Sequence, residues 1–334
     1  MAVKPLTTPM SQEQRRLVEI MRSTVADYGD VLRARDAYAG GMQWLTAKGN
    51  QYLTRYRQDP LTGDKKAGSL GRRTPETEKI YDAFMKERGE LDARIAELRP
   101  AMAEQARMAK ALRLSRAPSE VGGVLRAIGT SDLLDRVTLV GEASVYAYEN
   151  EMTSFLPRDV LPDDGLDLLV ADLASADLLD ELVAVLRRAK IPVTRKRAKG
   201  DVAELRTDDN LKIRLLTSSS IERLVDDYES DAAAHARRWA SEQPPIRSVV
   251  IDRSGRAASI SVLEPRAWAI LRCVLLDMEE MSAGRRETST ELVSATARMI
   301  HDRWPEPFAE EQIYGFGPLG DALEGEEFLP PPRM

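Results

Sequence analysis

An aspartate, Asp167, interrupts a short apolar run that extends from Leu166 to Val170. A carboxylate in such a run is costly to bury unless it is paired or binds a cation. Three more acids lie within five residues of it: Asp163, Asp164 and Asp172. Because the chain has two histidines, any metal site would use oxygen ligands, which favours magnesium, manganese or calcium. The simpler alternative is an ordinary strand whose Asp167 ends in water.

The elements before Asp167 decide what it can reach. Val137 to Val140 is an apolar run of strand length, and it breaks at Gly141. Residues 143–151 fit a helix, and residues 166–170 fit a second strand. The sequence therefore predicts a strand, a glycine turn, a helix and a strand that bears an acid.

The composition indicates a globular chain of 334 residues, with 43% hydrophobic residues, 31% charged residues and a net charge of −6. This charge argues against a protein that coats nucleic acid, although a local basic patch is still allowed. The single cysteine, Cys273, cannot form an internal disulfide, and the sequence has neither an apolar leader nor a run approaching 18 apolar residues. We expect a cytoplasmic protein without a membrane span.

The first third of the chain has the spacing of helices. We expect helices over Ser11–Ala39 and Gln43–Arg57, a polar loop over Gln58–Arg73 and a long helix over Pro75–Leu114. The apolar positions of the long helix need a partner, either the first helix or a second copy of the chain in a homodimer.

The remaining elements alternate unevenly. We expect a helix over 175–190, strands over 193–195, 201–206 and 211–216, a helix over 219–243, a hairpin over 248–262, and helices over 265–281 and 287–303. The acidic, proline-rich tail from Trp304 is expected to be mostly irregular. This order predicts an α+β fold, in which helical N-terminal and C-terminal regions flank a small mixed sheet. The expected regions are 1–117, 118–262, 263–303 and 304–334.

A basic stretch lies between Gly41 and Arg73. It holds two acids and seven basic residues, which are Lys48, Arg55, Arg57, Lys65, Lys66, Arg72 and Arg73. Trp44, Tyr52 and Tyr56 are interleaved with them. Such a stretch could hold a triphosphate or an RNA strand through phosphate contacts and stacking. The alternative is a solvated loop whose aromatic rings pack in the helical core.

Val140-Gly141 before a helix, followed by the strand acid in GLDLLVAD (165–172), resembles the nucleotidyltransferase superfamily of the DNA polymerase β type. The chain is more closely similar to a bacterial family of stand-alone nucleotidyltransferase-fold proteins, in which helical regions flank the core. Residues 48–53, 69–73, 75–78 and 265–269 support this resemblance.

The resemblance implies a nucleotide site around the glycine turn. In the superfamily, amides after the glycine hold phosphates, and strand acids hold two cations, Mg²⁺ or Mn²⁺, that activate a hydroxyl and stabilise the leaving pyrophosphate. The implied catalytic residues are Asp167 and Asp164, and the implied metal ligands are Asp167, Asp164 and Asp172. The implied nucleotide contacts are Gly141, Glu142, Ala143, Arg214, Arg272, Lys48, Arg72 and Arg73.

Three positions depart from the superfamily pattern. Position 142 is Glu142 rather than a small hydroxyl residue, the first acid of the strand pair falls at Gly165, and the third acid falls at Arg214. Asp167 is the acid that remains clearly in place, and a lone monodentate aspartate is a poor magnesium site.

These departures leave several functions open. The first is transfer of a nucleotide from a nucleoside triphosphate to a protein, RNA or small-molecule acceptor. The second is a catalytically degraded member that binds a nucleotide or a partner without turnover. The third is an interaction protein that uses the long helix. If a nucleotide binds, we expect binding to depend only weakly on magnesium.

Overall fold

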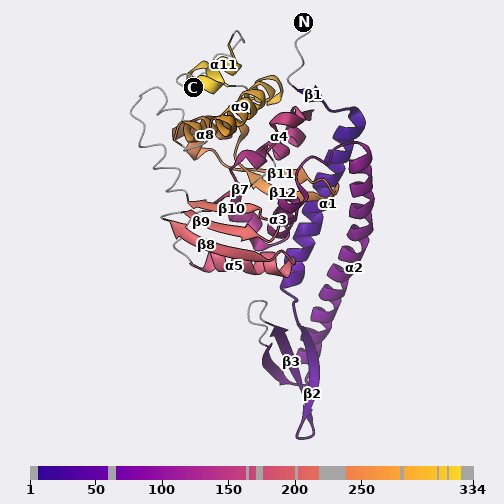
Figure 1. Ribbon diagram of the computed structural model, residues 1–334. Helices are drawn as coiled ribbons and strands as arrows, with labels where there is room; N and C mark the ends of the chain where they lie inside the picture. The colour runs from indigo at the N-terminus through magenta and orange to yellow at the C-terminus, as the bar shows by residue number, and fades with distance from the viewer. Residues whose placement is uncertain are drawn as a thin grey trace, which may run out of the picture.

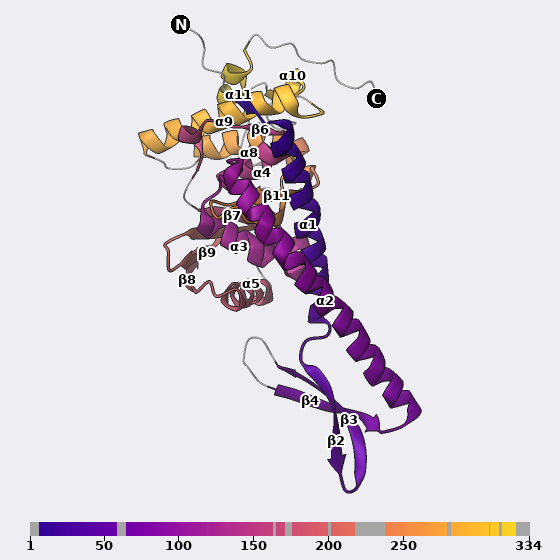
Figure 2. The same cartoon turned by 90° about the vertical axis from the view of Figure 1, so that its right-hand side faces the viewer.

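The computed structural model describes residues 7–58, 65–162, 165–170, 176–199, 202–217, 238–278, 282–306, 308–313 and 316–324. Most of the helix expected over 219–243 lies outside these residues, as do Asp163, Asp164 and Asp172. The fold is α+β, as the sequence predicts: a seven-stranded mixed sheet carries helices, and a separate three-stranded sheet lies at the far end of a long helix (Figure 1, Figure 2). No helix among the described residues is long and apolar enough to cross a membrane.

The large sheet places the strand of Asp167 at its centre. Its order is β11 (Ile246–Ile251), β12 (Ala257–Val262), β5 (Val137–Leu139), β7 (Leu166–Val170), β10 (Lys212–Thr217), β9 (Val202–Thr207) and β8 (Val193–Lys199). β5 pairs antiparallel with β7, and β7 pairs parallel with β10. The prediction that 137–140 and 166–170 form adjacent strands of one mixed sheet is confirmed.

Helices pack around this sheet. They are α3 (Ser119–Gly129), α4 (Val145–Glu151), α5 (Ala176–Arg188), α8 (Pro265–Met278) and α9 (Ala283–Arg303). Shorter elements are the 3-10 turns η1 (Asp132–Asp135), η2 (Glu142–Ser144) and η3 (Arg158–Val160), and the strand pair β1 (Thr8–Pro9) and β6 (Ser154–Phe155). α3 lies against β12 and α4 against β11, while α8 and α9 pack on each other (Figure 1). Just before α8, the Leu263 amide donates to the carbonyl of Leu139 at the end of β5. The glycine turn therefore lies between the sheet and the α8–α9 pair.

Two long helices precede the sheet: α1 (Gln12–Asp36) and α2 (Pro75–Ala111). α1 begins with a capping box at Ser11, and its buried face includes Leu17 and Met21. This face packs with Ala109 and with Val249 of β11, so α1 joins α2 to the sheet. The predicted pairing of α2 with the first helix is confirmed, whereas the homodimer stays a prediction.

The prediction of a helix over Gln43–Arg57 is wrong, and so is that of a loop over most of Gln58–Arg73. These residues form an antiparallel sheet of β2 (Gly41–Ala47), β3 (Asn50–Gln58) and β4 (Lys65–Arg72). Lys48 and Gly49 both have positive φ, 51° and 75°. Two such residues make the tight turn that matches the twist of a hairpin. The turn and the pairing of alternate side chains therefore override the helical spacing.

The tail is also more ordered than its composition suggests. α10 (Glu310–Ile313) and α11 (Gly317–Ala322) follow α9, and α11 packs against it. Phe308 and Leu319 are fully buried. The expectation is that most of the tail is irregular, and these two segments are its helical parts; apolar side chains such as Leu319 attach α11 to α9.

Candidate functional site

Asp167 meets Arg214 directly across the β7–β10 pairing. The strand register places the two residues side by side. Arg214 donates through Nε to Oδ1 at 2.5 Å and through Nη2 to Oδ2 at 2.7 Å. The Asp167 side chain is 15% exposed and that of Arg214 is 31% exposed. Such a bidentate pair is the strongest form of arginine–carboxylate contact, and it neutralises the acid.

Gly141 lies against the other side of Asp167. Its amide donates to the Asp167 carbonyl at 3.3 Å, and its carbonyl accepts the indole N–H of Trp268 at 3.0 Å. A Cβ atom at position 141 would stand 2.7 Å from Asp167 Oδ2. The chain needs glycine here because its backbone passes directly over the carboxylate.

Glu142 connects the turn to α8 and α9. Its Oε1 accepts from Arg272 Nη2 at 2.9 Å and from Ser289 Oγ at 2.6 Å, and its Oε2 accepts from Arg285 Nη2 at 2.8 Å. The Arg272 side chain is 3% exposed, and its Nε has no hydrogen-bond partner within the described structure. Glu142 therefore serves as the shared acceptor that makes a buried arginine tolerable.

Two buried aromatic residues, Tyr148 and Trp268, pack beside the glycine turn. Tyr148 and Trp268 make an edge-on contact with ring centroids 5.5 Å apart, and the Tyr148 hydroxyl donates to the Leu263 carbonyl at 3.0 Å. Burial, followed by the charge of Glu264, raises the pKa of Tyr148 well above its usual range. The phenol therefore remains a proton donor and fixes the position of α4.

Residues 119–313, more than half of the chain, match the model of the nucleotidyltransferase family. The chain belongs to the nucleotidyltransferase family. The match includes Gly141, Asp167 and Arg214, and it leaves out α1, α2 and the three-stranded sheet. No curated protein and no solved structure matched the chain.

The residues predicted to bind a nucleotide separate into two places in this nucleotidyltransferase-family chain. One group lies where β5 ends beside β7, at the rim of the sheet that we call the β5–β7 edge: Gly141, Glu142, Ala143, Arg214 and Arg272. Those in or beside the three-stranded sheet, at the far end of α2, are Lys48, Arg72 and Arg73 (Figure 2). The structure does not bring the second group to Asp167. Asp164 and Asp172 lie outside the described residues.

The described residues do not fit the two-cation site of the superfamily. Both oxygens of Asp167 already accept from Arg214. Gly165, at the position of the missing acid, has no side chain and a φ of +87°. Within the described parts of the chain, no group of three acid, histidine or cysteine side chains could hold a metal ion. The arginine at position 214 supplies the positive charge that a cation would supply in an acidic cluster.

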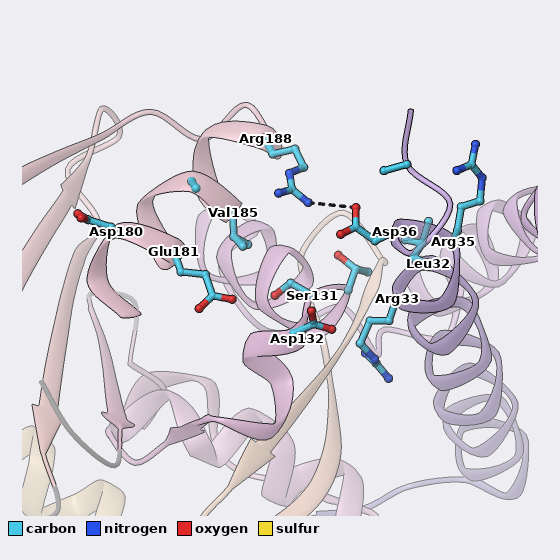
Figure 3. A pocket seen from close by; sticks show the side chains of 13 residues that line it. Leu32, Arg33, Arg35, Asp36, Ser131, Asp132, Asp180, Glu181, Val185 and Arg188 are labelled. Atoms are coloured by element: carbon cyan, nitrogen blue, oxygen red, sulfur yellow. Dashed lines mark ion pairs between the residues drawn. The ribbon is translucent and has the colours of Figure 1, made fainter. Parts of the chain in front are cut away.

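Sequence reasoning missed Arg285 and Ser289, which lie 143 and 147 residues from Glu142 along the chain. It also missed a hollow of about 690 Å³ between the end of α1, the α3–η1 loop and α5. Figure 3 shows Arg188 and Asp36 facing each other there, 3.9 Å apart. None of the predicted site residues lines this hollow. No local pattern in the sequence marks either feature.

Proposed function

We propose that this nucleotidyltransferase-family chain binds a nucleoside triphosphate at the β5–β7 edge through arginines and does not catalyse metal-dependent nucleotide transfer. The observation that carries the proposal is the bidentate Asp167–Arg214 pair. A catalytic acid must be free to hold a cation, and here each of its two oxygens already accepts from a guanidinium. Transfer to a protein, RNA or small-molecule acceptor is the competing activity.

The charges around the edge support binding of an anion. Arg214, Arg272 and Arg285 surround Asp167 and Glu142. Arg214 and Arg285 are partly exposed, whereas Arg272 is buried. A guanidinium has five N–H donors, so it can hold a carboxylate and a phosphate together. In this proposal the two exposed arginines contact phosphate, and Arg272 positions Glu142.

Calorimetric titration with ATP, GTP, CTP and UTP tests the proposal, with magnesium and then with a chelator. We expect binding of at least one triphosphate whose affinity changes by less than about threefold when the metal is removed. Arg285→Gln should weaken it by about tenfold, the scale of one charge-assisted contact. Arg247→Gln is the matched control, because Arg247 forms its exposed ion pair with Asp135 instead.

Transfer activity must be measured in the same preparations. An α-labelled triphosphate is incubated with the protein, with and without cellular RNA, and we expect no label in protein or RNA. Two results would contradict the proposal and indicate an active transferase. One is binding that is lost both with the chelator and in Asp167→Asn, and the other is label transfer that Asp167→Asn abolishes.

A gain-of-metal variant provides the complementary test. Arg214→Asp places a second carboxylate opposite Asp167 in the strand register. Two facing carboxylates repel each other unless a cation lies between them. We expect Mn²⁺ to raise the melting temperature of Arg214→Asp and to leave that of the wild type unchanged. Equal stabilisation of both proteins would show that the wild-type site already holds the ion.

A further inference from the structure

The three-stranded sheet has a charge opposite to that of the whole chain. Residues 41–58 and 65–73 contain no acid, whereas the whole chain has a net charge of −6. Their seven basic side chains are Lys48, Arg55, Arg57, Lys65, Lys66, Arg72 and Arg73. The sheet lies outside the matched family region and away from the seven-stranded sheet (Figure 1, Figure 2). Its charge therefore belongs to a separate surface.

One face of this sheet is used for packing. Trp44 pairs with Leu53 in the strand register, and Leu53 is fully buried. Trp44 contacts the ring of Tyr81 on α2, and the Arg55 guanidinium lies 4.9 Å from the centre of the Phe84 ring. Because side chains alternate across a strand, the neighbouring positions must face away from α2.

The outward positions combine aromatic and basic side chains. The register places Tyr52 between Leu45 and Arg72. Tyr56 pairs with Gly41, and its ring covers that glycine so closely that a Cβ there would stand 2.4 Å from the phenolic oxygen. Tyr56 is 37% exposed and Leu45 is 45% exposed. The outer face therefore presents ring surfaces beside cations.

Several of the cations are not neutralised by the protein. Lys48, Lys65 and Lys66 are exposed, and their ammonium groups make no hydrogen bond or ion pair in the part of the chain that the structure describes. Lys66 pairs in the register with Arg57, which lies on the same face as Arg55 and forms an ion pair with Asp36 at 3.2 Å. Lys65 lies one position along, on the face of Tyr56, so its charge is available to an external anion.

We propose that the outer face of the β2–β4 sheet binds single-stranded nucleic acid. Lys48, Lys65 and Arg72 contact phosphates, and Tyr52 and Tyr56 stack against unpaired bases. Bases of a duplex are already stacked on each other, so the rings favour a single strand. This surface is independent of the nucleotide site proposed at the β5–β7 edge, and either proposal can fail without the other.

Fluorescence anisotropy with the full-length protein tests the surface. The probes are labelled oligonucleotides of about 12 nucleotides, as single-stranded RNA, single-stranded DNA and duplex DNA, with heparin as a competing polyanion. We expect the wild type to bind a single strand more tightly than the duplex, in RNA, in DNA or in both. The tighter of the two identifies the preferred sugar.

Two sets of variants separate charge from stacking. Lys48→Ala/Lys65→Ala should lower affinity by about tenfold and reduce the salt slope by about 1.4, the loss of two single-strand phosphate contacts. The matched control Lys86→Ala/Lys110→Ala removes the same charge from exposed positions elsewhere and should bind as the wild type does.

Tyr56→Ala should weaken binding several-fold without changing the salt slope, and Tyr56→Phe should restore it, because stacking needs the ring and not the hydroxyl. Equal affinity for the single strand, the duplex and heparin would overturn the proposal, as would equal losses of affinity in the two lysine double variants. An unchanged melting temperature in each exposed-site variant shows that the fold is intact.

Discussion

The Asp167–Arg214 pair changes the chemistry of a site at a single position. Two acids facing each other across parallel strands would need a cation between them, whereas an acid facing an arginine is neutral without one. Glu142 repeats the pattern one step along the chain, since it also lies among basic donors. The edge of the sheet is therefore internally compensated, and its stability should not depend on a metal.

Removing Arg214 tests the structural part of this pair. Arg214→Ala leaves a largely buried carboxylate without its main donor, and we expect a loss of about 2 kcal/mol in the free energy of unfolding after allowance for partial exposure. Urea denaturation measures it. Arg247→Ala breaks an exposed pair and should cost less than about 1 kcal/mol. A similar cost for both variants would mean that Asp167 is well solvated.

Glu142 should matter more than an ordinary surface acid. Glu142→Ala removes the acceptor of the buried Arg272 and also of Arg285 and Ser289, so we expect a loss of about 3 kcal/mol. The double variant Glu142→Ala/Arg272→Met should recover part of this loss, because the buried charge is removed as well. If the loss in the double variant equalled the sum of the losses in the two single variants, this coupling would be contradicted.

At the scale of elements, sequence reasoning succeeded where patterns are local. The runs 137–140 and 166–170 are short, apolar and bounded by turns, and both are strands. The hairpin of β2 and β3 was missed because Trp44, Leu45, Tyr52 and Leu53 fit a helical spacing as well as a strand. Its turn has Lys48 where asparagine or glycine is usual.

The candidate site was only partly predictable for a related reason. The family resemblance assigned Arg214 to the position of the third acid, and the strand register places it beside Asp167. It did not predict that the two would bind each other, nor that Glu142 would bind Arg285 and Ser289 from a helix more than 140 residues away. Such contacts depend on how α8 and α9 dock, which no local pattern encodes.

Gly141 tests how tightly the turn fits β7. Gly141→Ala should destabilise the protein by about 2 kcal/mol, because the added methyl group meets the Asp167 side chain and neither backbone can easily move. Gly284→Ala in α9 is the control, since a Cβ there meets no atom within 4 Å. Thermal unfolding of both variants measures the difference. Equal tolerance at the two positions would contradict the close approach.

At the scale of the whole molecule, Glu151 joins α1 to the sheet. It accepts from Arg22 on α1 at 2.8 Å and from Ser248 on β11 at 2.6 Å. Burial raises the pKa of Glu151, and the Ser248 hydrogen bond and the charge of Arg22 oppose this only in part. The folded chain therefore holds this proton to a higher pH than the unfolded chain does.

The stability that Glu151 contributes is full below its unfolded pKa of about 4.3 and is lost as pH rises through the folded value. We expect Glu151→Gln to gain stability relative to the wild type as pH rises above about 4.3. Glu204 should behave oppositely, because the hydrogen bond from Arg206 lowers its pKa. Glu204→Gln should lose stability relative to the wild type as pH rises. Chemical denaturation at a series of pH values around 4.3 measures the free energy of unfolding of both variants and of the wild type. If the stability of each variant followed pH in parallel with that of the wild type, the two pKa directions would be contradicted.

The length of α2 has a mechanical consequence. Its 37 residues form one rod of about 55 Å, attached to the core at one end and carrying the small sheet at the other. At the attached end, Ala106 passes so close to Gly255 that no side chain fits between them. A rotation of about one degree at this root moves the far end by about 1 Å over the rod length. The contacts beside Gly255, together with the packing of α1 along α2, thus set the positional accuracy of a surface at the opposite end of the molecule.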